Sequence, residues 1–219
     1  MLKVKICGIT NQKDATDCVN LGADFLGFHF SKNSAKKISV KLAADIISKF
    51  PPFASAVGVF ADEEKENAVK IIKKCGLKFI QFSGAETADF CKEIKEGVEG
   101  VKIFKTFSVK KEADGSYPAI EEIKSFIGIA DYFVLDLSYL EIDGQNETGA
   151  LKNDFEIIPA IQGLGISYFI VCRTDIGGIS EIAEKTAPFG LEADAILDRL
   201  PTRKEYEKVK SFIKTARAQ

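Results

Sequence analysis

Two residues in this 219-residue chain could share proton-transfer chemistry, because each ends a short run of apolar and β-branched residues. Cys7 ends the run at residues 3–7, and Asp136 ends the run at residues 132–136. A thiol can act as nucleophile or general base once its pKa is lowered, and a carboxyl group across from it can supply the acid. Position alone is equally compatible with an inert core cysteine and an aspartate that caps a loop.

The elements that would position these residues follow a regular alternation of strand-like and helix-like segments, which is typical of βα units with parallel strands. We expect eight strands, at residues 3–7, 25–30, 56–60, 79–82, 101–106, 132–136, 168–172 and 193–197. Helical patterns follow from about residues 12, 40, 63, 87, 118, 154, 179 and 203. No G-x-G-x-x-G turn follows the first strand, so the sequence favours a single (β/α)8 TIM barrel, one domain over residues 1–219, over a doubly wound open sheet.

In a barrel, the loops after the carboxyl ends of the strands form the site. These loops are expected to hold Cys7 and Gly8, residues 31–38, 81–86, 136–149 and 172–178, and Asp198. The single histidine, His29, is expected to be packed or hydrogen-bonded within the second strand rather than catalytic.

The composition excludes several function classes. Thirty Lys and Arg against 32 Asp and Glu give a net charge of -2, which argues against a nucleic-acid surface. We expect a cytoplasmic protein, since no charged leader or membrane-length apolar run is present. Five cysteines without a C-x-x-C pair, beside one histidine, indicate reduced thiols and no metal site.

The residues around Cys7 also carry a resemblance to a known family. The segment KICGIT at residues 5–10, followed by Asp14 and Ala15, resembles the opening of phosphoribosylanthranilate isomerase, a tryptophan-pathway enzyme. Segments similar to the second, third and sixth strands of that family are GADFLGF at 22–28, VGVF at 57–60 and VLD at 134–136. Together these segments span most of the chain.

The resemblance implies an Amadori rearrangement, which converts an aminoaldose into an aminoketose without a cofactor. It implies Cys7 as general base and Asp136 as general acid. The acid protonates the ribose ring oxygen and opens the sugar to an imine, and the base removes the C2 proton to give an enolamine that tautomerises. Such an aspartate must start protonated, which needs a raised pKa.

The substrate-binding positions that the resemblance implies are partly altered. The family's Ser-Pro-Arg loop reads SAK at residues 34–36, so Lys36 keeps a charge for the substrate carboxylate without the bidentate guanidinium; a surface lysine is the alternative. Gln-Leu-His-Gly after strand four reads QFSG, which retains Gln81 and places Ser83 where the histidine stands. Thr148 and Gly149 keep part of the family's Gly-Gly-Thr-Gly loop, although a simple solvent loop explains them nearly as well.

The phosphate site that the resemblance implies differs most from the family's pattern. The family's Gly-Gly after strand seven and Ser-Gly after strand eight present backbone amides to a phosphate, and the corresponding residues are CR at 172–173 and LD at 197–198. Arg173 could supply a cation instead, or pair with Asp175 or Asp198. Asp198 would place a like charge beside the phosphate, and Gly177 and Gly178 could restore some amides.

The leading hypothesis is therefore an isomerase of the phosphoribosylanthranilate type that acts on a small, anionic molecule as a monomer or homodimer. A diverged barrel that acts on another or an unphosphorylated sugar amine is the second hypothesis. A non-catalytic relative that binds a small molecule is the third.

Overall fold

Eight parallel strands close into a barrel, as the alternating pattern predicts, with the first strand pairing with the second and the eighth. The computed structural model describes residues 1–141, 150–173 and 176–219. The barrel strands are β1 (Lys3–Ile6), β2 (Phe25–His29), β3 (Ser55–Phe60), β4 (Phe79–Phe82), β5 (Lys102–Ser108), β6 (Tyr132–Asp136), β9 (Tyr168–Cys172) and β10 (Gly190–Ala193).

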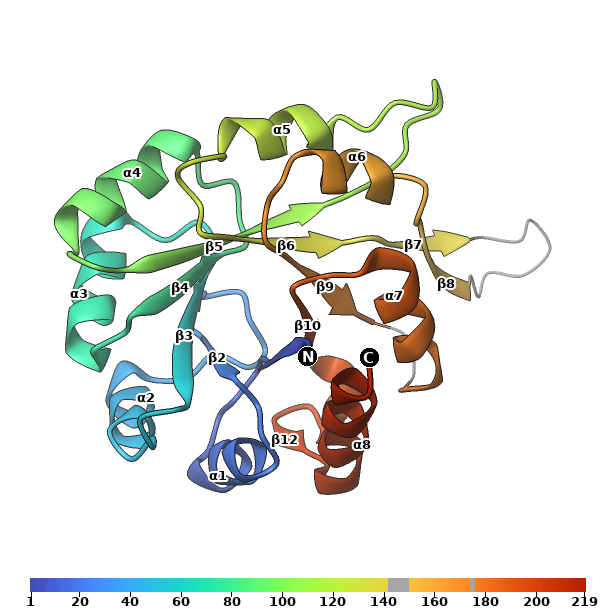
Figure 1. The fold of residues 1–219 in the computed structure, drawn as a ribbon. Helices are drawn as coiled ribbons and strands as arrows, with labels where there is room; N and C mark the ends of the chain where they lie inside the picture. The colour runs from blue at the N-terminus through green and yellow to red at the C-terminus, as the bar shows by residue number, and fades with distance from the viewer. Residues whose placement is uncertain (142–149, 174–175) are drawn as a thin grey trace.

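Helices surround the strands in Figure 1. They are α1 (Gln12–Asn20), α2 (Val40–Ile47), α3 (Lys65–Cys75), α4 (Ala88–Gly97), α5 (Ala119–Ser125), α6 (Ile158–Gly163), α7 (Ile179–Thr186) and α8 (Tyr206–Arg217). Several begin at a side-chain cap: Asn11, Ser39 and Thr87 accept from backbone amides of α1, α2 and α4. No described helix is long and apolar enough to span a membrane.

Two hydrophobic clusters hold the layers together. The larger packs the outward residues of the strands against the helices. The smaller contains Phe25, Phe104 and Phe169. The ring of Phe25 lies 5.5 Å from that of Phe104 and 6.0 Å from that of Phe169, although their strands are not neighbours. These rings therefore meet across the inside of the barrel, and side chains of the same parity further along each strand must enter the cavity above them.

The prediction of the eighth strand at residues 193–197 is wrong. Strand β10 ends at Ala193, and the apolar run that suggested a strand is a short 3-10 helix, η2 (Ala195–Leu197). The true strand was overlooked because it begins with glycine and contains Glu192, whose charge is compensated only by tertiary contacts. The first residues after the eighth strand are therefore Asp194 and Ala195, not Leu197 and Asp198.

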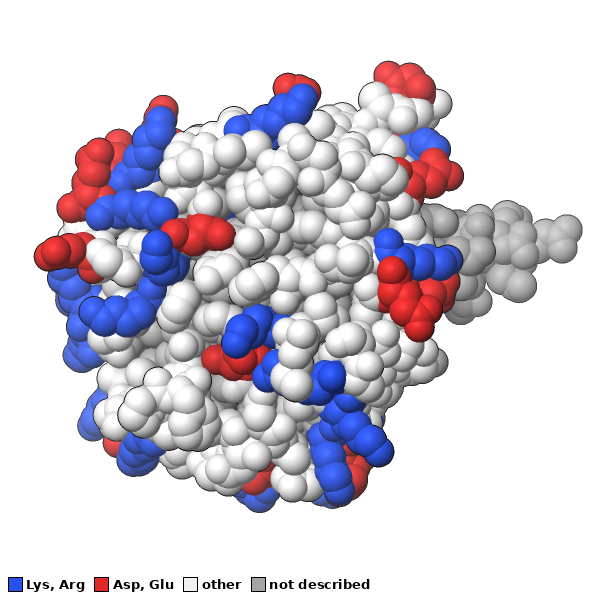
Figure 2. All heavy atoms as spheres, in the orientation of Figure 1, with Lys and Arg blue, Asp and Glu red and all other residues white. Residues whose placement is uncertain are grey.

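Two antiparallel hairpins lie outside the barrel and were not predicted. One, formed by β7 (Ser138–Glu141) and β8 (Ala150–Asn153), follows β6 and stands apart from the ring of strands in Figure 1. The other, formed by β11 (Asp198–Leu200) and β12 (Arg203–Lys204), precedes α8. On the face shown in Figure 2, acidic and basic side chains are interspersed, in keeping with the balanced composition.

Candidate active site

A cavity of about 730 Å³ opens at the carboxyl ends of the barrel strands. Its polar walls come from β2, β4, β5, β6, β9 and β10 or the residues directly after them. They include His29, Gln81, Ser83, Thr106, Asp136, Arg173, Glu192 and Asp194. The predicted positions Gln81, Ser83, Asp136 and Arg173 are thus brought together in one cavity.

Cys7 does not line this cavity; it lies behind Glu192, held by a charged network. Its Sγ accepts a hydrogen bond from Lys5 Nζ at 2.7 Å and donates one to Glu192 Oε1 at 3.4 Å. Lys5 Nζ also forms an ion pair with Glu192 Oε2 at 2.9 Å and donates to the side-chain oxygen of Gln81. We call Lys5, Cys7, Gln81 and Glu192 the floor cluster. Cys7 is 1% exposed and stands one hydrogen bond behind Glu192, which itself lines the cavity.

The floor cluster controls the charge on the thiol. Burial raises the pKa of Cys7 far above its ordinary value, the Glu192 carboxylate raises it further, and Lys5 acts in the opposite direction. Burial would lower the pKa of Lys5, but Cys7 and Glu192 outweigh it, so the pKa of Lys5 is raised. The resting site therefore holds Cys7 as a thiol beside an ammonium ion. A side chain at Gly27 would place its Cβ 2.5 Å from Cys7 Sγ, so glycine is needed there.

Asp136 is the last residue of β6 and lines the cavity, and its carboxylate already has hydrogen-bond and ion-pair partners. Its carboxylate accepts from the Ser138 amide at 3.2 Å and hydroxyl, and from Arg173 Nε at 2.7 Å. The Arg173 side chain is 55% exposed, so only the carboxylate end of this ion pair is well buried. Arg173 pairs with Asp136 rather than with Asp198, one of the two partners considered from the sequence; the other, Asp175, lies outside the described residues.

Gln81 and Ser83 extend the floor along β4. The Gln81 amide donates to Thr106 Oγ1 at 3.0 Å and lies 3.3 Å from Ser83 Oγ. The Ser83 and Thr106 hydroxyls are 3.0 Å apart, and either can donate. This row presents small hydroxyl groups to the cavity where the resemblance implied a histidine.

Lys36 belongs to a second charged network, above β1 and β10. It pairs with Asp194 and Asp198, and Lys204 pairs with the same two carboxylates at 2.9 and 2.7 Å. We call Lys36, Asp194, Asp198 and Lys204 the rim cluster. Its two cations and two anions compensate each other, so Lys36 is neither a surface lysine nor a free cation facing the cavity. Only Asp194 of this cluster lines the cavity.

The rim cluster keeps Asp194 ionised. Burial would raise the pKa of Asp194, but His29, Lys204 and Lys36 outweigh it and hold the pKa well below its usual range. Gly8 makes room for this cluster: its φ is +76°, and a Cβ there would lie 2.3 Å from Asp194 Oδ1. Gly8 therefore has a steric role beside Asp194.

His29 faces the same carboxylate from β2. Its buried Nε2 lies 3.4 Å from Asp194 Oδ2, and this contact is one of those that lower the pKa of Asp194. The structure places His29 on the cavity wall, which the sequence did not indicate.

The remaining predicted positions lie elsewhere. Gly177 and Gly178 belong to the 3-10 helix η1 (Ile176–Gly178), which precedes α7, and neither lines the cavity. Thr148 and Gly149 lie outside the described residues.

Sequence reasoning missed Lys5, Glu192, Asp194 and Lys204. Lys5 and Glu192 are charged residues at inward-facing positions of otherwise apolar strands, and Lys5 lies two residues before Cys7 on the same face. A charged residue at such a position is the sequence signal by which both could have been identified.

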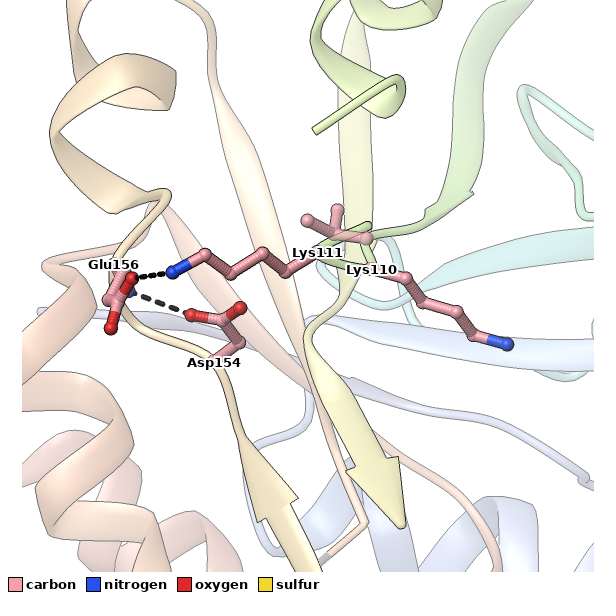
Figure 3. Close-up of a pocket in the computed structure, with 5 residues that line it drawn as sticks. Lys110, Lys111, Asp154 and Glu156 are labelled. Atoms are coloured by element: carbon pink, nitrogen blue, oxygen red, sulfur yellow. Dashed lines mark hydrogen bonds and ion pairs between the residues drawn. The ribbon is translucent and has the colours of Figure 1, made fainter. Parts of the chain in front are cut away.

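A second cavity, of about 390 Å³, lies away from this chemistry (Figure 3). Lys110 and Lys111 approach it from the segment after β5, and Asp154 and Glu156 from the segment after β8. Lys111 is paired with Glu156, and Lys110 points away from both acids in Figure 3. The exposed Lys111–Glu156 pair resembles an ordinary surface ion pair, so this second cavity is not the candidate site.

A closed barrel of eight parallel strands, with polar side chains gathered in one cavity at their carboxyl ends, defines a (β/α)8-barrel enzyme. The family model for N-(5'-phosphoribosyl)anthranilate (PRA) isomerase matches residues 4–215, and the chain belongs to this family.

Individual relatives agree with this assignment. The chain is 31% identical over 221 residues to an N-(5'-phosphoribosyl)anthranilate isomerase from Trichlorobacter lovleyi, covering 99% of this chain and 98% of the relative. The crystal structure of phosphoribosyl anthranilate isomerase from Thermotoga maritima is similar with a TM-score of 0.84 and 27% identity, and both chains are covered completely. A phosphoribosyl anthranilate isomerase in complex with reduced 1-(o-carboxyphenylamino)-1-deoxyribulose 5-phosphate has a TM-score of 0.84, 26% identity and the same coverage.

Proposed function

We propose that this protein catalyses the Amadori rearrangement of an N-aryl aminoaldose to the aminoketose, the isomerase step of tryptophan biosynthesis. The observation that carries the proposal is the placement of Cys7 and Asp136 at the carboxyl ends of β1 and β6 in a chain of the isomerase family, with Asp136 and the hydrogen-bond partner of Cys7, Glu192, lining one cavity. The substrate is a small molecule, and we infer a cytoplasmic enzyme that binds it as an anion.

In the first step, Asp136 gives a proton to the ribose ring oxygen. The C1–O bond breaks, and the nitrogen lone pair forms the C1=N bond of the imine. Asp136 can do this only when it is released from Arg173, which now lies 2.7 Å away. We infer that the substrate carboxylate takes Arg173 as its partner, and that the released Asp136, now beside a second carboxylate, takes up a proton from solvent and becomes the acid.

In the second step, Cys7 removes the C2 proton as a thiolate. Its own proton passes to Glu192, the acceptor 3.4 Å from Sγ, while Lys5 at 2.7 Å stabilises the sulfur charge. The enolamine then loses its hydroxyl proton and gains one at C1, so the reaction needs no oxidant or external reductant. Gln81 and Ser83 are proposed to bind sugar hydroxyls; Gly8 and Lys36 hold Asp194 in place.

Roles for four further residues are proposed from the sequence alone. Thr148 and Gly149, which lie outside the described residues, are proposed to bind the substrate, and Gly177 and Gly178 to supply amides at the start of α7.

The Arg173 to Asp136 ion pair favours a second candidate function. If Arg173 did not leave Asp136, the cavity would bind a small molecule without turning it over. The test is an assay of the purified protein on phosphoribosylanthranilate and on its unphosphorylated analogue, ribosylanthranilate, with the aminoketose as the measured product. We expect turnover of at least one compound. Binding of the reduced product analogue without turnover of either compound would instead support the second candidate.

A further inference from the structure

A buried lysine on β5 takes no part in the chemistry described so far. Lys105 is 1% exposed and directly precedes Thr106, whose hydroxyl belongs to the row on the cavity wall. Neighbouring residues of a strand face opposite sides of the sheet, so the Lys105 side chain lies between the barrel and the helices. Its Nζ is 5.9 Å from the centre of the Phe107 ring and 5.6 Å from that of Phe126. A charge in such a place is costly unless it is paired and hydrogen-bonded.

The partners of Lys105 lie in the segment that follows β4. Its Nζ donates to the carbonyl oxygen of Gly84 at 2.6 Å and forms an ion pair with Glu86 Oε2 at 3.4 Å. The Glu86 side chain is 3% exposed, so both ends of this pair are withdrawn from water. Glu86 Oε2 also accepts from the Gly84 amide at 2.9 Å. Both backbone polar groups of Gly84 are therefore held, the amide by Glu86 and the carbonyl by Lys105.

The same carboxylate joins this segment to the one that follows β3. Glu86 Oε1 accepts from the Asp62 amide at 2.8 Å, and Asp62 Oδ1 accepts from the Ala85 amide at 2.8 Å. Asp62 has a φ of +53°, in the left-handed region that is uncommon for residues with a side chain. A Cβ at Gly84 would lie 2.4 Å from Asp62 Oδ1, so the two segments touch. We call Asp62, Gly84, Glu86 and Lys105 the clamp.

The clamp reaches the cavity through the backbone that it holds. Ala61, Ser83 and Gly84 line the cavity, and each belongs to the clamp or is next to one of its residues in sequence. The charged side chains of the clamp are not among the described groups that line the cavity. Ser83 is the residue proposed to bind a sugar hydroxyl, and a binding group must be held within about 0.5 Å of its productive position. The position of Ser83 therefore depends on the clamp.

We propose that Lys105 is a positioning residue for substrate binding, which holds the segment after β4 so that Ser83 and Gly84 meet the sugar. The inference rests on the proposed isomerase function and adds a residue to its substrate site. Lys105 acts on substrate affinity and not on proton transfer, because the groups that move protons lie on other strands. These groups are Cys7 directly after β1, Asp136 on β6 and Glu192 on β10.

The test compares Lys105→Met with a core variant of the same strand. Lys105→Met keeps the length of the side chain, releases the Gly84 carbonyl and leaves Glu86 unpaired. KM for phosphoribosylanthranilate should rise by about tenfold, the effect of losing one well-placed hydrogen bond, while kcat stays within about threefold of the wild type. The matched control is Ile103→Ala, since Ile103 is buried two residues nearer the amino end of β5. It should also lower stability, but leave KM within about twofold.

A double variant separates positioning from a purely structural role. Lys105→Met with Glu86→Gln removes both charges, so the protein should regain stability in denaturant unfolding while KM stays raised, because the Gly84 carbonyl still lacks its donor. Recovery of KM together with stability would assign Lys105 a structural role only. If Lys105→Met alone does not fold, Glu86→Gln alone is measured against the same prediction of raised KM at unchanged kcat.

Two further measurements separate this proposal from the proposed function. The reduced product analogue, 1-(o-carboxyphenylamino)-1-deoxyribulose 5-phosphate, should bind about tenfold more weakly to Lys105→Met than to the wild type, which needs no turnover. Amide hydrogen exchange at Asp62, Gly84 and Ala85 should be faster in Lys105→Met than in Ile103→Ala. A protein that turns over the substrate with equal KM in these two variants would overturn the positioning role alone. A wild type that neither converts nor binds these compounds would overturn both.

Discussion

The floor cluster and the rim cluster both pair lysines with carboxylates, but with different results. In the floor cluster, one lysine is shared between a thiol and a carboxylate, so the cysteine sits between a charge that favours its thiolate and a group that can take its proton. In the rim cluster, two lysines are matched by two aspartates, and no charge is left over for a ligand.

This difference separates groups that can transfer protons from groups that compensate one another's charge. The groups of the floor cluster, with Asp136 across the cavity, can move protons on a substrate. The rim cluster holds Asp194, one of the carboxylates on the cavity wall, between two lysines.

The largest expected effect is on turnover. Asp136→Asn removes the proton that opens the sugar, so kcat should fall by about 10²–10⁴ for phosphorylated and unphosphorylated substrates alike. Asp198→Asn, in the rim cluster but away from the cavity, is the control and should retain kcat within about fivefold. A loss of kcat with only one of the two substrates would show that Asp136 acts in substrate recognition, which would contradict its assignment as the general acid.

The next effect is on stability, in the floor cluster. Lys5→Met leaves Glu192 as a buried charge without its ion-pair partner, so the free energy of unfolding should fall by about 3–5 kcal/mol. The double variant Lys5→Met with Glu192→Leu should recover most of that loss, because no unpaired charge remains. Denaturant unfolding of the two variants checks this; an equally unstable double variant would show that packing, not charge, is lost.

The smallest effect concerns the pH dependence of the rim cluster. The pKa of Asp194 is lowered by folding, so its ion pairs stabilise the protein above the unfolded pKa of about 3.9 and this contribution is lost as pH falls below it. The difference in unfolding free energy between wild type and Asp194→Asn should therefore shrink between pH 6 and pH 3, within roughly that acidic window. A difference that stayed constant across this range would mean that Asp194 contributes by shape alone.

Much of this arrangement could be predicted from the sequence, because strand periodicity and strand ends are local properties. The pattern located β1 through β9 of the barrel to within a few residues and placed Cys7, Gln81, Asp136 and Arg173 at the correct end. The eighth strand was misplaced because Glu192 interrupts its apolar pattern, and the error hid both Glu192 and Asp194.

The rest depends on contacts between residues far apart in the chain. Lys36 and Asp194 are separated by 158 positions, and Lys5 and Glu192 by 187. A single sequence shows the charge of each residue but not its partner. Lys36 was therefore expected to hold a substrate carboxylate or to lie on the surface, and its role within a compensated network became visible only in the folded chain.

The most direct test of the central claim, that the floor cluster carries the chemistry, is a single-turnover measurement with the enzyme in excess. Wild type and Cys7→Ser are mixed with phosphoribosylanthranilate, and formation of the aminoketose is followed in time. We expect Cys7→Ser to bind the substrate but to convert it about 10²–10⁴ times more slowly, since a serine hydroxyl is a far weaker base than a thiolate held by Lys5. Equal rates for the two proteins would contradict the account and assign removal of the C2 proton to Glu192.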